Sequence, residues 1–506
     1  MRFDFDNFEF IELSEQPRRA AIHDASGCMS WQALRTAVDV WMLAATDAGA
    51  RADQPLVITG HKEADFVVAM LGCLRLGVPF VPIDVINPAE RVRRITELVQ
   101  ATLVYDTQKQ RFSTTGHAPQ TLAEKGVAYI MFTSGSTGDP KGVQIGRESL
   151  GLFASWIREC LNLGAAPVFM DQMLFSFDFS LFNWVGALTC GGTVALCARE
   201  TIEDGMAFAE YLAKTRVSVW ASTPSFVRQQ MLGADFNAAQ LPDLKVFVFG
   251  AESLTPTMAE ALWERFPAVR IVNSYGPTEA TCSTTWVEID PAMRRAAPLP
   301  FPIGRAKPYA DVFIEAGEIC MSGDHVMRGY LNRPDLNETR MFTRNGKRGY
   351  RSGDVGDMDA LGLVTFRGRR DDQIKMHGYR IELAEVDAAL ALLPGVRAGA
   401  TIALKRPDGV IVRMIGFVDP DHTGPAGLHA PGAALKDWKA ILARRVPSYM
   451  VPSELLVCHG FPITQTEKVD RKKLEQMYRD SRVTSVSNNS NNSTPVRPPA
   501  FAGQPA

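Results

Sequence analysis

A loop suited to phosphate binding is the first chemical feature of the sequence. An apolar run from Tyr129 leads into Thr133, Ser134, Gly135, Ser136, Thr137 and Gly138, with Lys141 shortly after. Glycines let the backbone approach a phosphate chain, hydroxyls and amides donate hydrogen bonds, and a lysine supplies positive charge. The loop is not a Walker A loop, because Pro140 precedes the lysine and an extended segment follows it. A flexible surface loop is the alternative.

Three further segments carry groups that suit nucleotide or substrate binding. They are Phe177-Asp-Phe-Ser, Asn273-Ser-Tyr-Gly-Pro-Thr-Glu-Ala-Thr and Tyr350-Arg-Ser-Gly-Asp. Carboxylates are hard oxygen ligands for Mg²⁺, and a tyrosine ring offers a face for stacking. Each segment by itself is also compatible with an ordinary turn.

The elements that position these segments follow an alternating pattern up to about residue 370. Residues 54–60 have the composition of a buried strand, and residues 64–77 that of a helix ending at Gly77. Later apolar runs lead into loops rich in Thr, Ser, Gly and Pro; they are residues 217–222, 244–250 and 269–274. The pattern predicts an α/β fold with mostly parallel sheets and helices. Since open α/β sheets bind ligands beyond the carboxyl ends of their strands, we expect a site at these junctions.

A smaller α+β region is predicted after Gly368-Arg-Arg-Asp-Asp-Gln. It has a helix near residues 382–393, two strands near 398–404 and 411–418, and a final helix near 434–445. We therefore expect a large N-terminal domain in residues 1–370, a small domain in residues 371–482 and a disordered polar tail in residues 483–506. The tail is rich in Ser and Asn and cannot bury enough apolar surface to order itself.

The composition narrows the classes of partner. The 506 residues carry a formal net charge of −2, so there is no general basic field for nucleic acid or anionic lipid, and we expect neither nucleic acid nor membrane insertion. The eight cysteines form no CxxC pair, which favours reduced buried thiols over a zinc site or a disulfide framework. The N-terminus is acidic, unlike a signal peptide, and a cytoplasmic location is expected.

Together these segments resemble the adenylate-forming superfamily, which includes acyl-CoA synthetases, luciferases and the amino-acid-activating domains of nonribosomal peptide synthetases. Val446-Pro-Ser-Tyr-Met-Val-Pro and Thr466-Glu-Lys-Val-Asp-Arg complete the set, which spans residues from about 70 to 471 in the family's order. The resemblance implies an ATP- and Mg²⁺-dependent enzyme with a large N-terminal domain and a small mobile C-terminal domain. Its ATP-binding residues would be Thr133, Ser134, Gly135, Ser136, Thr137, Gly138, Lys141, Asn273, Ser274, Tyr275, Gly276, Pro277, Thr278, Asp354 and Arg369.

The resemblance also implies individual roles within this set. A side-chain amide in the segment from Asn273 would read the adenine edge and Tyr275 would stack on the base. Thr278 would donate to the α-phosphate and Glu279 would bind Mg²⁺, both as members of the catalytic group. Asp354 would accept the ribose hydroxyls, with Arg369 on the ribose or a nearby phosphate.

Lys468 is the catalytic cation that the resemblance implies. When a carboxylate attacks the α-phosphorus, two anions approach each other, and a lysine between them stabilises the charge of the transition state. The family usually has glycine just before this lysine, whereas this chain has Glu467. Asp371 stands at the family's hinge, where the small domain would rotate to bring residues 375–380 to the site for thiol attack.

Asp178 points to an amino acid as the activated acid. A buried carboxylate is costly unless a cation pairs with it, and the α-ammonium of an amino acid is such a cation. The alternative is that Asp178 caps a helix that begins at Phe179. Three stretches resemble the stand-alone D-alanine–carrier protein ligases; they are Val219-Trp-Ala-Ser-Thr-Pro-Ser-Phe, Ala259-Glu-Ala-Leu-Trp-Glu-Arg-Phe-Pro and Gln373-Ile-Lys-Met-His-Gly-Tyr-Arg-Ile-Glu-Leu. By alignment with these ligases, the pocket would be lined by Asp178, Phe179, Phe182, Ala221, Val248, Gly250, Ser274, Cys282 and Ser283.

The two phenylalanines favour a small side chain, and alanine of either enantiomer is the first choice. Gly250 replaces an expected cysteine, which makes room in the pocket, so serine, threonine, 2-aminobutyrate and proline stay open. No carrier domain is evident, so the acceptor would be the phosphopantetheine thiol of a separate carrier protein, and the basic stretch 436–445 would contact it. The alternatives are an acyl- or aryl-CoA ligase with the same chemistry and an inactive nucleotide-binding homologue.

Overall fold

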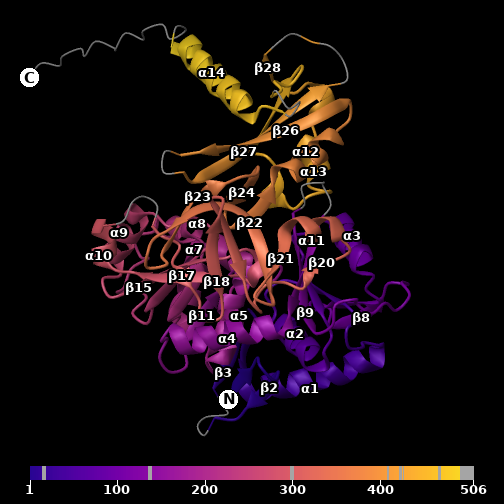
Figure 1. Ribbon diagram of the computed structural model, residues 1–506, viewed down its shortest axis with the longest axis vertical. Coiled ribbons are helices and arrows are strands. Elements are labelled where there is room, and N and C mark those ends of the chain that lie inside the picture. Colours follow the sequence, from indigo (N-terminus) through magenta and orange to yellow (C-terminus); the bar gives the residue numbers. More distant parts are fainter. Residues whose placement is uncertain are drawn as a thin grey trace, which may run out of the picture.

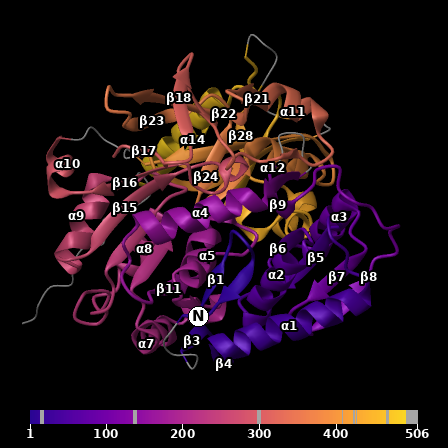
Figure 2. The same cartoon turned by 60° about the horizontal axis from the view of Figure 1, so that its bottom comes forward.

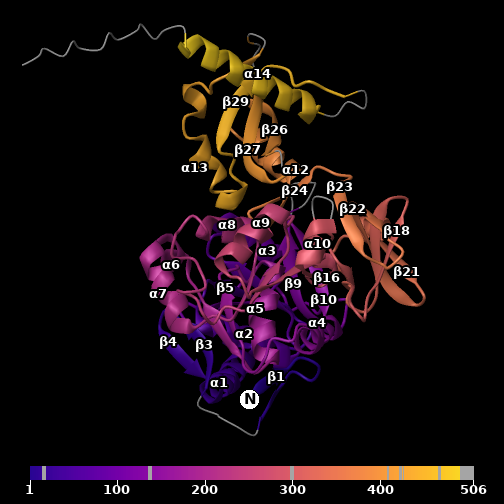
Figure 3. The same ribbon diagram turned by 90° about the vertical axis from the view of Figure 1, so that its left-hand side faces the viewer.

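The structure is a computed structural model that describes residues 1–13, 19–134, 140–296, 301–406, 409–420, 424, 427–464 and 469–490. A large α/β body carries a smaller unit at one end, and α1, Trp31–Ala48, runs along the other end (Figures 1 and 3). Among the described helices, none has both the length and the hydropathy that crossing a membrane requires.

Two large sheets form the body. The first has the order β20-β10-β9-β6-β5-β7-β8, and its strands β5, β6, β7 and β9 run parallel. Its strands are β5 Leu56–Gly60, β6 Phe80–Asp84, β7 Leu103–Asp106, β8 Arg111–Thr114, β9 Val127–Thr133, β10 Lys141–Gly146 and β20 Gly329–Tyr330. The buried strand and following helix predicted at residues 54–77 are confirmed as β5 and α2, Ala64–Leu76. Gly77 closes α2 in the left-handed conformation, φ 70°, which glycine adopts without strain.

The second sheet has the order β17-β16-β15-β14-β13-β11-β12-β3-β4, and its centre is parallel. Its strands are β3 Ala20–Asp24, β4 Gly27–Ser30, β11 Val168–Asp171, β12 Thr193–Leu196, β13 Val219–Ser222, β14 Val246–Phe249, β15 Arg270–Tyr275, β16 Thr285–Ile289 and β17 Arg305–Ala306. The three apolar runs predicted as strands are β13, β14 and β15. They are neighbours in this sheet, so the loops that follow them lie side by side at one edge.

Helices pack between and around the two sheets. Helices α2, α4 and α5 lie between them, where one apolar cluster joins residues of both (Figure 2). The remaining helices of the body flank the outer faces and the loops. The helices are α3 Ala89–Val99, α4 Arg147–Cys160, α5 Leu181–Thr189, α6 Arg199–Glu203, α7 Gly205–Thr215, α8 Pro224–Gln230, α9 Pro256–Arg265, α10 Pro291–Ala296 and α11 Pro334–Arg340. The predicted α/β class with a smaller α+β C-terminal part is therefore confirmed.

A third sheet leads from the body to the small unit (Figure 3). Its strands are β18 Asp311–Glu315, β19 Glu318–Ser322, β21 Met341–Arg344, β22 Lys347–Met358 and β23 Val364–Arg369. The long strand β22 carries Asp354, and its antiparallel partner β23 ends at Arg369, which is paired with Asp354 in the register.

The small unit packs two apolar clusters on its four-stranded sheet, order β26-β27-β29-β28. One cluster includes the hairpin β24–β25 and α12; the other includes α14. The elements are β24 Gln373–Met376, β25 Tyr379–Glu382, α12 Leu383–Ala391, β26 Val396–Lys405, β27 Ile411–Pro420, β28 Leu428–His429, α13 Trp438–Leu442, β29 Glu454–Cys458 and α14 Arg471–Ser490.

Two details of this unit differ from the sequence prediction. The helix expected at 434–445 is shorter and is not the last, because α14 follows it and continues past residue 482 to Ser490. The reason is that Leu474 and Tyr478, spaced one helical turn apart in a charged segment, are buried against the small sheet. The later part of the predicted tail, residues 491–506, lies outside the described residues.

Candidate active site

Asp178 begins a short 3₁₀ helix, η1 Asp178–Ser180, and is only 6% exposed. It does not cap the helix, since Phe177 occupies the cap position and no side-chain cap bond is present. Burial, opposed by a hydrogen bond from Thr278 and by the charge of Lys375, raises the pKa of the Asp178 carboxyl to about 6. The structure therefore buries a carboxylate whose charge a bound cation would stabilise.

Phe179 and Gly250 define the size of the neighbouring space. A Cβ atom on Gly250 would lie 2.4 Å from Cε2 of Phe179, so the ring packs directly on the glycine backbone. The ring centre of Phe182 lies 4.9 Å from that of Phe179. The expectation that Gly250 enlarges the pocket is therefore corrected, because the Phe179 ring fills the room that the missing side chain leaves.

The ends of the central strands contribute the other predicted pocket residues. Ala221 of β13 and Val248 of β14 are fully buried and stand opposite each other in the register. Ser274 of β15 shares a hydrogen bond with Ser283, hydroxyl to hydroxyl. Cys282 is 4% exposed and has a φ of 68°, a conformation that non-glycine residues adopt at a cost and that clusters at functional sites.

A cavity of 430 Å³ opens beside these strands and is lined by predicted nucleotide ligands. Asn273, Ser274, Tyr275, Asp354 and Arg369 all face it. The Tyr275 hydroxyl donates a 2.5 Å hydrogen bond to Asp354. The amide nitrogen of Asn273 donates to the carbonyl of Pro302 at 2.8 Å, so its donor group is already engaged by the backbone.

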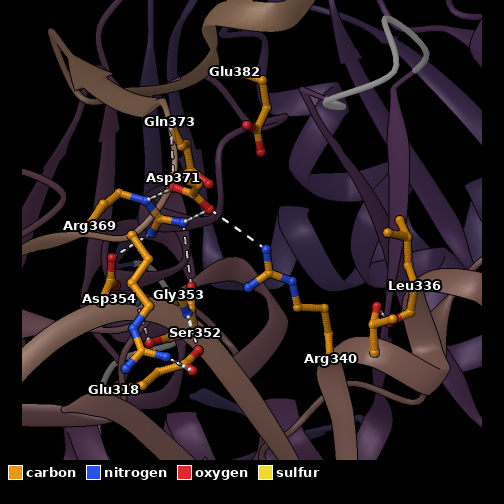
Figure 4. A network of polar contacts seen from close by, with 12 residues as sticks. Glu318, Leu336, Arg340, Ser352, Gly353, Asp354, Arg369, Asp371, Gln373 and Glu382 are labelled. Atoms are coloured by element: carbon orange, nitrogen blue, oxygen red, sulfur yellow. Dashed lines mark hydrogen bonds and ion pairs between the residues drawn. The ribbon is translucent and has the colours of Figure 1, made fainter. Parts of the chain in front are cut away.

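A charged network joins Asp354 to the start of the small unit (Figure 4). Arg369 donates to Asp354 at 2.5 Å and to both carboxylate oxygens of Asp371 at 2.6 and 2.8 Å. Arg340 of α11 lies 3.7 Å from Asp371 on the other side. Asp371, the predicted hinge residue, is therefore held to Asp354 through the guanidinium of Arg369.

The hairpin β24–β25 enters the site next to Glu279. Glu279 is fully buried, accepts from Tyr330 at 2.5 Å and forms a 2.6 Å ion pair with Arg380. Burial opposes its ionisation, but Arg380 and Lys141 lower the pKa of Glu279 to about 2. Glu279 is therefore charged at neutral pH, and Arg380 occupies the position beside its carboxylate.

The described part of the phosphate loop also contacts the hairpin. Lys141 forms a 3.2 Å ion pair with Glu382, and the Ser134 hydroxyl donates to the carbonyl of Arg380. The Thr133 hydroxyl is buried without a hydrogen-bond partner among the described residues, which leaves it available to a ligand. The remaining loop residues and the lysine expected to be catalytic lie outside the described residues; they are Gly135, Ser136, Thr137, Gly138 and Lys468.

Two further residues hold the backbone of the site. A Cβ on Gly276 would lie 2.6 Å from Cα of Ser283, so only glycine fits between these segments. Pro277 caps the short helix η2, Thr278–Ala280, which carries Thr278 and Glu279.

Several site residues were missed at the sequence level. Tyr330 stands outside every recognised segment and offered no signal. Glu382 lies in a recognised segment, but its partner Lys141 is 241 positions away, so only the fold reveals the pair. Phe301, Ile303 and Phe366 add apolar walls to the nucleotide cavity and likewise come from separate strands and loops.

Comparison with known proteins shows the family of this chain. Residues 11–331 match the family described as AMP-binding enzyme, and the chain belongs to this family. A D-alanine–D-alanyl carrier protein ligase of Bacillus licheniformis is 33% identical over 477 residues, which are 88% of this chain and 92% of the relative. One from Lacticaseibacillus rhamnosus is 33% identical over 454 residues, 84% of this chain and 89% of the relative.

Solved structures show the same fold. An adenylation domain of Vibrio cholerae, AlmE, in complex with glycyl-adenosine-5'-phosphate has a TM-score of 0.76 and 20% identity, covering 92% of this chain and 95% of that one. A nonribosomal peptide synthetase protein with adenylation and PCP domains has a TM-score of 0.73 and 23% identity, covering 90% of this chain and 81% of that one.

Proposed function

We propose that this chain is a stand-alone enzyme that forms aminoacyl-AMP from ATP and a small amino acid and passes the aminoacyl group to the phosphopantetheine thiol of a separate carrier protein. The buried Asp178 carboxylate carries this proposal, because an α-ammonium is the cation that such a site would pair. The acids that acyl- and aryl-CoA ligases activate carry no ammonium that could pair with this carboxylate. The names of the relatives from Bacillus and Lacticaseibacillus support the same reading.

The first half-reaction would use the groups around the 430 Å³ cavity. Asp354 would accept the ribose hydroxyls, and Tyr275 would stack on the adenine. Thr278 and the phosphate loop with Lys141 would hold the phosphates while the substrate carboxylate attacks the α-phosphorus. Lys468 would bridge the two anions in the transition state.

Glu279 is the residue proposed to hold Mg²⁺. Among the described residues no group of three or more His, Cys, Asp and Glu side chains could hold a metal ion. Mg²⁺ bound at a nucleotide site commonly has one or two carboxylates plus substrate phosphates, so a single ionised Glu279 fits. The metal would neutralise phosphate charge, and Arg380 would have to leave Glu279 to admit it.

We infer that this position of the small unit suits the second half-reaction. Its hairpin contacts Glu279, Lys141 and Ser134. Val469, next to Lys468, packs in the apolar cluster on the other face of the small sheet from the hairpin. A rotation about Asp371 would exchange the two faces, which supports alternation between an adenylation and a transfer arrangement.

The Phe179 ring on Gly250 supports a substrate with a very small side chain. Alanine is the proposed substrate, and the names of the relatives favour its D-enantiomer. The Phe179 ring already fills part of the space beside Gly250, so this space suits a substrate side chain no larger than a methyl group.

Amino-acid-dependent exchange of labelled pyrophosphate into ATP tests the proposal. We expect exchange with D-alanine, and less with larger amino acids, in a screen of both enantiomers. Asp178→Asn should abolish the exchange that depends on an amino acid. Asp335→Asn, the same change on the exposed surface, should leave that exchange intact. Exchange supported by fatty or aryl acids and by no amino acid would refute the proposal.

A further inference from the structure

A buried ion pair joins the two large sheets of the body. Lys62 follows β5 of the first sheet, and Asp171 ends β11 of the second. Nζ of Lys62 lies 3.1 Å from Oδ1 of Asp171, and the two side chains are 1% and 0% exposed. The function proposed above uses neither residue, although the chain runs from Asp171 directly through residues 172–177 to Asp178.

The carboxylate of Asp171 depends on Lys62 for its balancing charge. Asn183 of α5 donates a hydrogen bond to Oδ1 of Asp171 at 3.2 Å. The other oxygen, Oδ2, has no hydrogen-bond partner among the described residues. Burial raises the pKa of the Asp171 carboxyl, and the charge of Lys62 opposes this effect. Removal of the lysine would therefore leave a buried carboxyl group without a counter-charge.

The same ammonium also holds the middle of the segment that leads to Asp178. Nζ of Lys62 lies 3.9 Å from the centre of the Phe175 ring, and such a cation–π contact is strongest where water is excluded. Phe66 of α2 packs on the same ring, with the two ring centres 4.7 Å apart. A hydrogen-bonded turn of residues 174–177 then joins this ring to Asp178. Lys62 therefore fixes the segment both at its start and near its end.

We propose that Lys62 is a positioning residue for Asp178, because it holds the segment 171–178 at two points and so sets where the Asp178 carboxylate meets the α-ammonium of the substrate. This inference rests on the proposed function. Without the cation, the segment would have to move toward water to relieve the buried Asp171 carboxylate, and Asp178 would move with it. Neither Lys62 nor the segment lines the 430 Å³ nucleotide cavity, so ATP binding would not depend on the pair.

Pyrophosphate exchange in the full chain measures the KM for the amino acid and the KM for ATP separately. With the amino acid that gives the fastest exchange, Lys62→Met should raise the amino-acid KM on the order of tenfold or more, because removing one partner of a buried pair is strongly unfavourable. The KM for ATP should stay unchanged. A purely structural loss would instead reduce the amount of active enzyme, and so the maximal rate, without changing either KM.

Phe175→Leu tests the same role without leaving a charge unpaired. It keeps both members of the ion pair and removes only the ring beside the ammonium, so it should raise the amino-acid KM several-fold. Arg147→Met is the matched control. Arg147 is also a partly buried cation on a phenylalanine ring, 3.8 Å from the centre of the Phe8 ring, and it lies outside the segment. This control should leave both KM values unchanged.

A double variant tests whether Lys62 acts through Asp171. Lys62→Met combined with Asp171→Asn removes both charges and keeps an amide oxygen that can accept from Asn183. Replacing both partners of a buried pair is often close to neutral, whereas removing one is not. The double variant should therefore return the amino-acid KM most of the way to that of the unchanged chain.

The outcomes separate this inference from the proposed function. An unchanged amino-acid KM in Lys62→Met or in Phe175→Leu would overturn the role of Lys62, and so would an equal rise in the two KM values. A double variant no better than Lys62→Met would also overturn it. In each of these cases, amino-acid-dependent exchange by the unchanged chain would still support the proposed function, whereas absence of exchange with every amino acid would refute that function itself.

Discussion

The Arg91 guanidinium of α3 donates a 2.5 Å hydrogen bond to the Glu385 carboxylate of α12, and both side chains are more than nine-tenths buried. The pair joins the large body to the small unit. The pair therefore stabilises only those arrangements of the two units in which α3 and α12 are in contact. Breaking a buried pair by removing one partner costs about 3–5 kcal/mol, because an uncompensated charge stays behind.

Arg91→Met should therefore slow transfer to pantetheine by roughly a hundredfold or more, at about 1.4 kcal/mol per tenfold, and leave pyrophosphate exchange unchanged or faster. Arg93→Met on the same helix is the control, because Arg93 is 63% exposed and its ion pair with Glu97 lies on the surface. Equal slowing of both half-reactions would contradict a role specific to this arrangement.

Lys468→Ala should abolish adenylate formation and leave transfer from preformed aminoacyl-AMP largely intact. The reason is that the lysine bridges anions only in the first half-reaction. Exchange and single-turnover transfer measured on the same preparation check this. Lys473→Ala, five positions along on α14, is the control, because Lys473 is exposed and does not line the nucleotide cavity. A parallel loss of both half-reactions in Lys468→Ala would count against domain rotation.

Acid should weaken amino-acid binding through Asp178. Its pKa of about 6 in the free enzyme means that the carboxyl becomes neutral as the pH falls through 6, and a neutral carboxyl pairs poorly with an ammonium. The kcat/KM for the amino acid should fall about tenfold per pH unit below that value. The KM for ATP should not follow the same curve. A pH profile that is flat between 5 and 7 would contradict the assignment.

Phe179→Ala should admit larger amino acids, such as 2-aminobutyrate, because it empties the space that the ring fills. Gly250→Ala should lower activity with alanine on the order of tenfold or more, since an added Cβ would push the ring into the pocket. Gly233→Ala is the control, because its Cβ would meet its nearest neighbour at an ordinary 3.4 Å. Exchange assays over a graded series of side chains give the result; an unchanged preference in Phe179→Ala would refute the packing argument.

The sequence by itself determined the fold class and the main groups of the site. Strands β13, β14 and β15 could be predicted because short apolar runs that end in Ser- and Gly-rich loops depend only on local pattern. Asp178, Glu279, Asp354 and Lys141 could be named because each stands in a recognisable segment. Helix α14 was not predicted from the sequence, because two buried residues in a charged stretch do not produce a recognisable helical periodicity of apolar residues.

Only the tertiary structure decided how these groups pair. The space beside Gly250 looked open in the sequence, yet the Phe179 ring from another segment fills it. Likewise, nothing local to Arg91 or Lys141 indicates its partner, which lies far away in the sequence. Such pairings join residues more than two hundred positions apart, and their energies depend on burial that only the packed fold creates.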